Sequence, residues 1–195
     1  MEALIAGSPI ARAVLVASLV ALAVGEVFVR LRKTNISQST RVDRGSILAV
    51  VAGIAAGGIL AGWFSATAEG WEIPGSWLLL AVAVLLIWCG IALRQWAVLT
   101  LGPSFTVVVR VREDQRVVDG GPFRWVRHPS YTGLLMTVAG LGLAVGNWLS
   151  LASLIVLPFI GIAARIRVEE AALLSSLPGY REYAAGRARL IPGIW

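Results

Sequence analysis

The chain contains 195 residues with a net charge of +6, and 57% of them are hydrophobic while only 14% are charged. Soluble domains carry about 25% charged residues, so this composition excludes an ordinary soluble domain and favours a single integral membrane unit. The basic residues flank apolar segments instead of forming a free patch, which argues against nucleic acid as a partner. The single cysteine, Cys89, cannot form an intramolecular disulfide, and we expect it to face lipid or to fill a packing gap.

The first apolar segment covers residues 13–29 and is closed by Arg30, a pattern that predicts a retained membrane helix and not a cleaved signal. Within this segment, Glu26 is a candidate functional carboxylate, because intramembrane charges are usually functional. Arg30 lies four residues further on, so a local ion pair is the favoured interpretation of Glu26.

The second apolar segment, residues 47–68, is rich in glycine at four-residue intervals. Such small residues let two helix backbones approach closely. We expect them to pack against another helix of the same chain and not against a second copy. The residues concerned are Gly53, Gly57, Gly58 and Gly62.

The third apolar segment begins at Trp77 and stays apolar to Leu101, although Arg94 marks a membrane interface before its end. The last segment, residues 131–164, contains no charged residue. As one straight helix it would be about 51 Å long, well over the roughly 30 Å hydrocarbon core of a bilayer. It must therefore bend back or tilt severely.

The pair Gly146-Asn147 lies near the middle of that last segment and favours a tight turn, because both residue types tolerate positive φ. We therefore expect two short helices that form a hairpin. The resulting fold class is an all-α integral membrane protein with five transmembrane helical segments, the last two forming the helical hairpin.

The distribution of basic residues predicts the orientation of these segments. Lysine and arginine are enriched in cytoplasmic loops. Segments 30–46, 94–130 and 165–195 together carry 16 of the 17 Lys and Arg residues, which leaves only Arg12 on the opposite side. We therefore expect the amino terminus outside and these three segments in the cytoplasm.

The connection between the third and fourth segments is too long for a simple turn, and long loops in compact proteins are usually functional. Residues 105–111 are rich in β-branched side chains and favour an extended strand. Residues 119–122, Asp-Gly-Gly-Pro, offer free backbone amide groups to a ligand. His128, the only histidine, follows at the edge of the hairpin. Arg165 and Glu169 lie four residues apart, hence on one helix face, at the other end of the same hairpin.

These residues allow more than one interpretation from their pattern alone. His128 is either an interfacial residue that caps a helix or part of a pocket, and the charges around it are either a structural ion network or a site for a zwitterionic ligand. One histidine with no cysteine near it falls short of the three or four ligands of a zinc site, so no metal is expected. Neither a GxxxxGK[ST] phosphate loop nor a GxGxxG turn after a strand occurs.

The order VVDGGPFRWVRHPSYTG, RIRVEEAALL and GYREYAAGRARLIPG closely resembles the isoprenylcysteine carboxyl methyltransferase family of integral membrane enzymes, over about the carboxyl-terminal half of the chain. The resemblance implies methyl transfer from S-adenosylmethionine to a lipidic or prenylated acceptor, with membrane lipids as further partners. Carboxyl O-methylation of a prenylcysteine-like acceptor is the leading function. Phospholipid-type amine N-methylation and a non-enzymatic lipid-binding membrane protein are the alternatives.

The resemblance also implies roles for individual residues. Arg165, Glu169 and His128 would be catalytic, and Arg165 matches the family's substrate-contacting arginine. The guanidinium of Arg165 suits a carboxylate, which favours O-methylation. The implied cofactor contacts are Gln115, Arg116, Val117, Val118, Phe123, His128, Pro129, Ser130, Tyr131 and Glu169.

Two positions depart from the family pattern. Phe123 stands where the family usually has tyrosine, which removes a hydroxyl group. Residues 177–180, Leu-Pro-Gly-Tyr, replace the commoner FGxEY with one residue fewer, so Tyr180 and Tyr183 are hard to align.

We expect one compact membrane domain. Residues 1–100 would form its three amino-terminal transmembrane helices, and residues 101–195 the cytoplasmic loop, the hairpin and the carboxyl-terminal cofactor-binding catalytic region. The cofactor pocket would be built from the loop before the hairpin and from the carboxyl-terminal segment. The active site of this multi-pass protein would face the cytoplasm. The protein would lie in the inner membrane of a bacterium or in the endoplasmic reticulum of a eukaryote.

Overall fold

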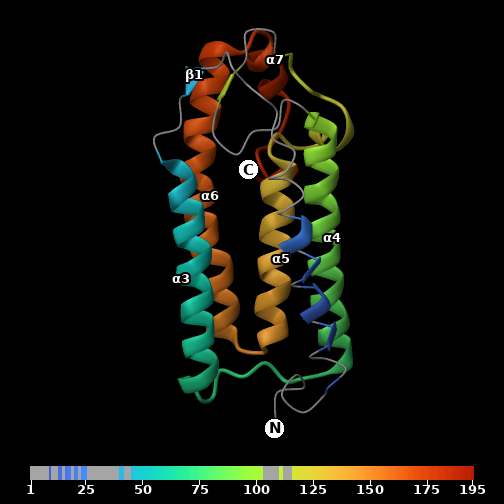
Figure 1. Cartoon of the computed structure of the whole chain (residues 1–195), viewed down its shortest axis with the longest axis vertical. Helices are drawn as coiled ribbons and strands as arrows, with labels where there is room; N and C mark the ends of the chain where they lie inside the picture. Colours follow the sequence, from blue (N-terminus) through green and yellow to red (C-terminus); the bar gives the residue numbers. More distant parts are fainter. Residues whose placement is uncertain are drawn as a thin grey trace.

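A computed structural model describes residues 9, 13, 14, 16–18, 20, 21, 23–25, 40, 41, 45–102, 110, 111 and 116–195. Four helices make up most of this part of the chain (Figure 1): α3 (Ser46–Thr67), α4 (Trp77–Leu101), α5 (Pro129–Val145) and α6 (Trp148–Ser176). Helix α3 packs along α6, α4 packs along α5, and α5 contacts α6 to join the two pairs. The last two helices form the expected hairpin.

Three of these helices, α3, α4 and α6, are long and apolar enough to cross a membrane, and α5 is a shorter apolar helix. The chain is an integral membrane protein on this architecture. The described residues of the expected first span, between 13 and 25, are helical. Glu26, Arg30 and Gln115 lie outside the described residues, and so does most of the expected strand at 105–111.

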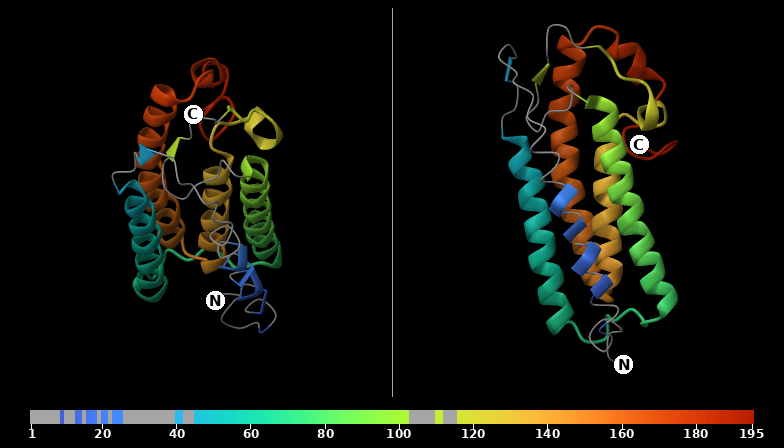
Figure 2. Two further views of the ribbon diagram at one scale, coloured as in Figure 1. Left: turned by 45° about the horizontal axis from the view of Figure 1, so that its top comes forward. Right: turned by 45° about the vertical axis from the view of Figure 1, so that its right-hand side comes forward.

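Two short elements lie beside the helices at one end of the bundle. Strand β1 (Thr40–Arg41) pairs antiparallel with β2 (Arg110–Val111), so the all-α expectation needs a small correction. A 3-10 turn, η2 (Gly121–Arg124), and helix α7 (Tyr180–Ala185) lie at the same end (Figure 2). The residues expected to form the pocket are thus gathered where α4 ends and α5 begins.

The turn between α5 and α6 lies at Gly146-Asn147, as its residue types predict. Gly146 ends α5 with a φ of 76°, which glycine adopts without strain. The side-chain oxygen of Asn147 accepts hydrogen bonds from the backbone of Leu149 (3.0 Å) and Ser150 (3.1 Å), and so caps α6.

Helix α6 continues beyond the apolar segment that ends at residue 164 and reaches Ser176, since residues 165–174 contain neither glycine nor proline. A helix of this length would measure about 44 Å and therefore extends beyond the hydrocarbon core of a bilayer. Its last turns carry Arg165, Glu169 and Glu170 on a continuous rigid element.

The glycines of α3 divide between two surroundings. A Cβ atom on Gly53 would lie 2.5 Å from the carbonyl oxygen of Leu157, and one on Gly57 would lie 2.9 Å from that of Ser153, so both glycines let α3 approach α6 closely. The predicted packing within the chain is confirmed for these two. Gly58 and Gly62 would meet no described atom within 4 Å.

The carboxyl-terminal tail, residues 186–195, folds back onto the bundle. Ala188 forms a parallel bridge with Val126, and the backbone N–H of His128 donates to the carbonyl of Arg189 at 3.0 Å. Leu190 is buried beside Ile162 and Ile166 of α6. The tail therefore lies against the start of α5 and fills space next to α6.

Candidate functional site

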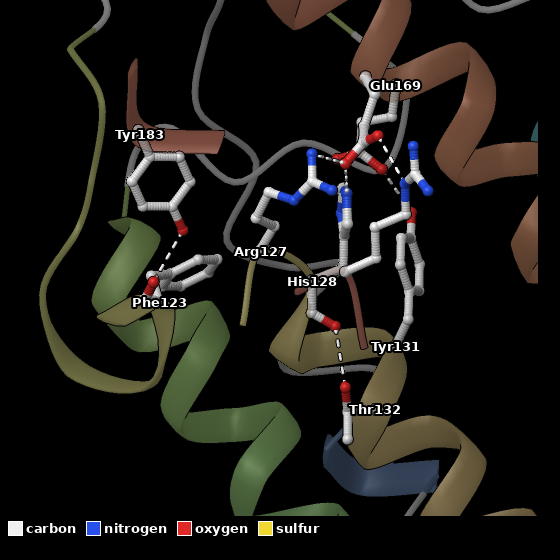
Figure 3. A network of polar contacts seen from close by, with 9 residues as sticks. Phe123, Arg127, His128, Tyr131, Thr132, Glu169 and Tyr183 are labelled. Carbon is white, nitrogen blue, oxygen red and sulfur yellow. Dashed lines mark hydrogen bonds and ion pairs between the residues drawn. The ribbon is translucent and has the colours of Figure 1, made fainter. Parts of the chain in front are cut away.

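One carboxylate, Glu170, is the centre of a buried ionic cluster at this end of the bundle, to which the side chains of Arg127 and His128 belong (Figure 3). Its Oε1 lies 2.6 Å from Nη1 of Arg127 and 3.2 Å from Nε2 of His128. Its Oε2 accepts a hydrogen bond from Nε of Arg189 at 2.8 Å. Both Glu170 and His128 are only 5% exposed. The loop before α5, the last turns of α6 and the tail are thus connected through a single side chain.

The interpretation of His128 as a helix cap holds for its position but not for its side chain. His128 occupies the N-cap position of α5, but its side chain makes no capping hydrogen bond. The imidazole instead meets Glu170 and lies against the ring of Tyr131, with 5.8 Å between the ring centroids. His128 therefore belongs to the ionic cluster and not to the helix end.

Tyr131 joins the two residues of α6 that were expected to share a face. Nε of Arg165 donates a hydrogen bond to the Tyr131 hydroxyl at 2.6 Å, and that hydroxyl donates to Oε2 of Glu169 at 2.9 Å. Within the described residues this is the only hydrogen bond of the Glu169 side chain, and the residue is half-buried. Glu169 thus combines a fixed position with partial access from outside.

Arg165 is 3% exposed and also contacts the start of α3. Its Nη1 donates to the hydroxyl of Ser46 at 3.0 Å. Arg165 therefore holds three helices together, through Ser46 of α3, Tyr131 of α5 and its own position on α6.

An apolar cluster adjoins the charged one. Phe123, Tyr180 and Tyr183 are buried in it, and Val117 and Val118 pack against them. The hydroxyl of Tyr183 donates to the backbone carbonyl of Phe123 at 2.8 Å, which fixes the η2 turn. Burial raises the pKa of Tyr183 to about 12, so this donor stays protonated at neutral pH.

The Tyr180 hydroxyl has a different environment. It is buried and finds no hydrogen-bond partner among the described residues. Burial raises its pKa above the ordinary value, and the nearby charge of Glu170 adds to the rise. A buried hydroxyl without a partner normally requires an explanation, and here it lies between the apolar cluster and the ionic one.

The structure gathers most of the expected site residues, but not all in the expected way. His128, Tyr131, Glu169 and Arg165 belong to the charged network, and Val117, Val118 and Phe123 to the apolar cluster. Pro129 is buried in the first turn of α5. The hydroxyl of Ser130 receives a hydrogen bond from Arg94 of α4 at 2.8 Å, and Arg116 is exposed.

The sequence prediction missed three residues of the ionic cluster: Glu170, Arg127 and Arg189. Glu170 directly follows Glu169 and Arg127 directly precedes His128, so each candidate had a charged neighbour that could have been included. Arg189 gave no such signal, because only the folded tail brings it to α6. Within the described residues no group of three metal-binding side chains lies together, so the expected absence of a metal stays a prediction.

Fold and site together define a polytopic helical membrane protein with a buried ionic cluster at one end of the bundle. Residues 81–175 match the isoprenylcysteine carboxyl methyltransferase (ICMT) family. The resemblance found in the motifs is thus confirmed.

Individual relatives agree with this assignment. A probable protein-S-isoprenylcysteine O-methyltransferase of Oryza sativa subsp. indica is 33% identical over 116 residues, which cover 58% of this chain and 61% of the rice protein. A protein-S-isoprenylcysteine O-methyltransferase of Schizosaccharomyces pombe is 35% identical over 108 residues, covering 51% of this chain and 45% of the yeast protein. The chain therefore spans about half to three fifths of the length of these relatives.

The fold has a solved counterpart. The structure of the eukaryotic intramembrane Ras methyltransferase ICMT aligns with a TM-score of 0.63 and 23% sequence identity, over 96% of this chain and 69% of that one. The two proteins share a fold, and the chain's helices are therefore arranged as in a known membrane enzyme.

Proposed function

We propose that this protein methylates the carboxylate of a membrane-soluble, prenylcysteine-like acceptor with S-adenosylmethionine as methyl donor. The observation that carries the proposal is the network of Tyr131, Glu169 and Arg165 within the family segment. It combines a half-buried carboxylate with a buried guanidinium group at the end of membrane helices. Such a combination suits a ligand that carries both an ammonium and a carboxylate group.

The residues fit S-adenosylmethionine by their chemistry. Glu169 would bind the ammonium group or a ribose hydroxyl, because its carboxylate is fixed on one side and accessible on the other. The apolar cluster of Phe123 and Tyr180 would accommodate the adenine ring. The Tyr180 hydroxyl and Nε of Arg127 are buried and have no hydrogen-bond partner in the described part of the chain. A polar ligand would provide hydrogen-bond partners for both groups.

When bound, S-adenosylmethionine supplies a methyl group on a positively charged sulfur. The protein's residues contribute position more than reactive chemistry, since effective molarities of well-oriented groups are worth about 7–11 kcal/mol. A carboxylate acceptor is already ionised at pH 7 and needs no general base, whereas an ammonium acceptor must first lose a proton. Arg165 would attract and orient the acceptor carboxylate, and the buried setting strengthens that attraction.

We further propose the finer architecture expected from the sequence. Residues 13–29 would form a fifth span, and residues 101–195 would carry the catalytic region of one compact domain. The basic loops would face the cytoplasm, in a bacterial inner membrane or in the endoplasmic reticulum. The acceptor would enter sideways from the membrane and the soluble cofactor from the cytoplasm.

Methyl transfer with purified protein tests the proposal. Radiolabelled S-adenosylmethionine and a farnesylcysteine analogue should give a product from which base releases the label, as an ester requires. A base-stable product would instead support N-methylation. If no product forms and calorimetry detects no binding of S-adenosylhomocysteine, the result would support the alternative of a non-enzymatic lipid-binding protein.

Two substitutions test the residues within the same assay. His128→Ala and Glu169→Ala should each weaken S-adenosylhomocysteine binding by roughly tenfold or more, because the first removes a buried polar partner and the second a half-buried carboxylate. Glu182→Gln is the matched control, since Glu182 is an exposed carboxylate of α7. Undiminished affinity in both alanine variants would contradict the site assignment.

A further inference from the structure

Glu170 has no role in the proposed reaction, yet it is the most heavily contacted carboxylate of the described residues. Arg127, His128 and Arg189 all lie within 3.2 Å of its oxygens. With two guanidinium groups at 2.6 and 2.8 Å it is a carboxylate ion, and an ionised carboxylate can only accept hydrogen bonds. Its contact with His128 therefore determines where a proton on the imidazole must be.

The proton must be on Nε2 of His128. That nitrogen lies 3.2 Å from Oε1 of Glu170, and only an N–H group can satisfy an acceptor there. A neutral imidazole carries one N–H and one lone pair, so Nδ1 of His128 then carries the lone pair. Nδ1 makes no hydrogen bond within the described part of the chain.

His128 is also held from its backbone. Its N–H donates to the carbonyl of Arg189 at 3.0 Å, and the side chain of Arg189 in turn donates to Glu170 at 2.8 Å. The ring lies against Tyr131 at an interplanar angle of 28°. The imidazole thus has one orientation, set by Glu170, by the tail and by the neighbouring aromatic ring.

We propose that Glu170 is a positioning residue, which fixes His128 in the Nε2–H form so that Nδ1 is the atom offered to the ligand. This inference rests on the proposed function. A lone pair on Nδ1 accepts a hydrogen bond, so the ligand group at His128 is an O–H or N–H donor, such as a ribose hydroxyl or an ammonium group. A ligand carboxylate, which has no proton to donate at neutral pH, does not bind there.

The single histidine makes this proposal directly measurable. Protein labelled with ¹⁵N-histidine contains only the two ring nitrogens of His128 in its imidazole spectrum. Above the titration range of an ordinary imidazole, Nε2 should give the signal of a protonated nitrogen and Nδ1 that of an unprotonated one. The Nδ1–H form in the unliganded wild-type protein would overturn the proposal without any variant.

Variants of Glu170 test the cause. Glu170→Ala should give a mixture of the two tautomers and raise the KM for S-adenosylmethionine about tenfold while kcat changes less, because Glu170 acts on binding through His128. Glu170→Gln keeps an acceptor oxygen for Arg127 and His128 and should retain the Nε2–H form. Glu182→Gln controls for the loss of one negative charge at an exposed position. A Glu170→Ala protein with the wild-type tautomer would contradict the proposal.

Ligand titration separates this inference from the proposed function. Saturating S-adenosylhomocysteine should shift the Nδ1 signal and leave Nε2 protonated, and a shift confined to Nε2 would refute the inference. If calorimetry detects no binding of S-adenosylhomocysteine by the wild-type protein, the proposed function fails. The tautomer of the unliganded protein still decides whether Glu170 positions His128.

Discussion

The two ends of the helical bundle are built from different chemistry. At the end near Gly146, the backbone itself closes the fold: Ile73 donates to the carbonyl of Gly146 at 2.8 Å, and Trp148 donates to that of Trp71 at 2.9 Å. At the other end, buried charges join the segments through Glu170 and Arg165. Neutral groups are sufficient for closing one end.

This difference shows that the fold itself does not call for buried ions. Removing charges from water carries a large desolvation cost, and apolar residues of similar volume often stabilise a protein as well or better. The ionic end therefore has a composition that stability alone does not explain. Buried charge clusters with perturbed pKa values are typical of functional sites. If the ionic end is functional and the neutral end structural, substitutions at the two ends should differ in their effect on activity.

The largest effect is expected for Arg165→Ala. The substitution removes the hydrogen bonds to Tyr131 and Ser46 and leaves Glu169 without a cationic partner in its network. Hydrogen bonds of charged groups are worth about 1.5–3 kcal/mol, so kcat/KM should fall by roughly 100-fold or more. Steady-state methyl transfer measures this loss.

Arg165→Lys is the control for charge alone. Lysine keeps the positive charge but lacks the planar fork that reaches both Tyr131 and Ser46, so it should restore only part of the activity. Full activity in the alanine variant would mean that the ionic end is structural after all.

A smaller effect is expected for Tyr131→Phe. The change deletes the hydroxyl that receives a hydrogen bond from Arg165 and donates one to Glu169, while the ring that faces His128 remains. Cofactor affinity should fall about tenfold, measured by calorimetry with S-adenosylhomocysteine.

The matched control for Tyr131→Phe lies at the other end of the bundle. Thr67 donates its hydroxyl to the carbonyl of Trp63 at 2.8 Å, at an exposed position. Thr67→Val also deletes one hydroxyl hydrogen bond and should leave cofactor affinity unchanged. Equal losses in the two variants would remove the distinction between the ends.

The neutral parts of this architecture were predictable because they depend on local residue types. Apolar runs gave the helices, and Gly146 with Asn147 gave the turn, since positive φ and N-capping are properties of single residues. The four-residue spacing of Arg165 and Glu169 likewise predicted the helix that continues past the apolar segment.

The ionic site was predictable only in part. The spacing of Arg165 and Glu169 predicted a shared face, and Tyr131 does link them. The partnership of Glu170 with Arg189 depends on how the tail folds back, which no local periodicity encodes. Predicting contacts between segments far apart in sequence requires the packed tertiary structure, even when each residue stands out in the sequence by its charge.

The smallest effect is expected for Asn147→Ala, at the neutral end. The change removes the cap on α6 and the 3.4 Å hydrogen bond to the carbonyl of Ala68, and should cost about 1 kcal/mol of stability, read as a lower unfolding temperature. Asn147→Ser keeps a capping oxygen without adding a charge at this buried position, so it should retain most of that stability.

Methyl transfer by the Asn147 variants then gives the sharpest test of the division. Helix α6, which contains Pro158, runs from the residue after Asn147 to Ser176 and carries Glu170, so it links this cap directly to the ionic cluster. If the ends are independent, both variants keep wild-type kcat/KM at temperatures well below unfolding. A fall in kcat/KM with Asn147→Ala but not with Asn147→Ser would mean that fraying of the first turn of α6 is transmitted along the helix to Glu169 and Glu170. The two ends would then act as one unit.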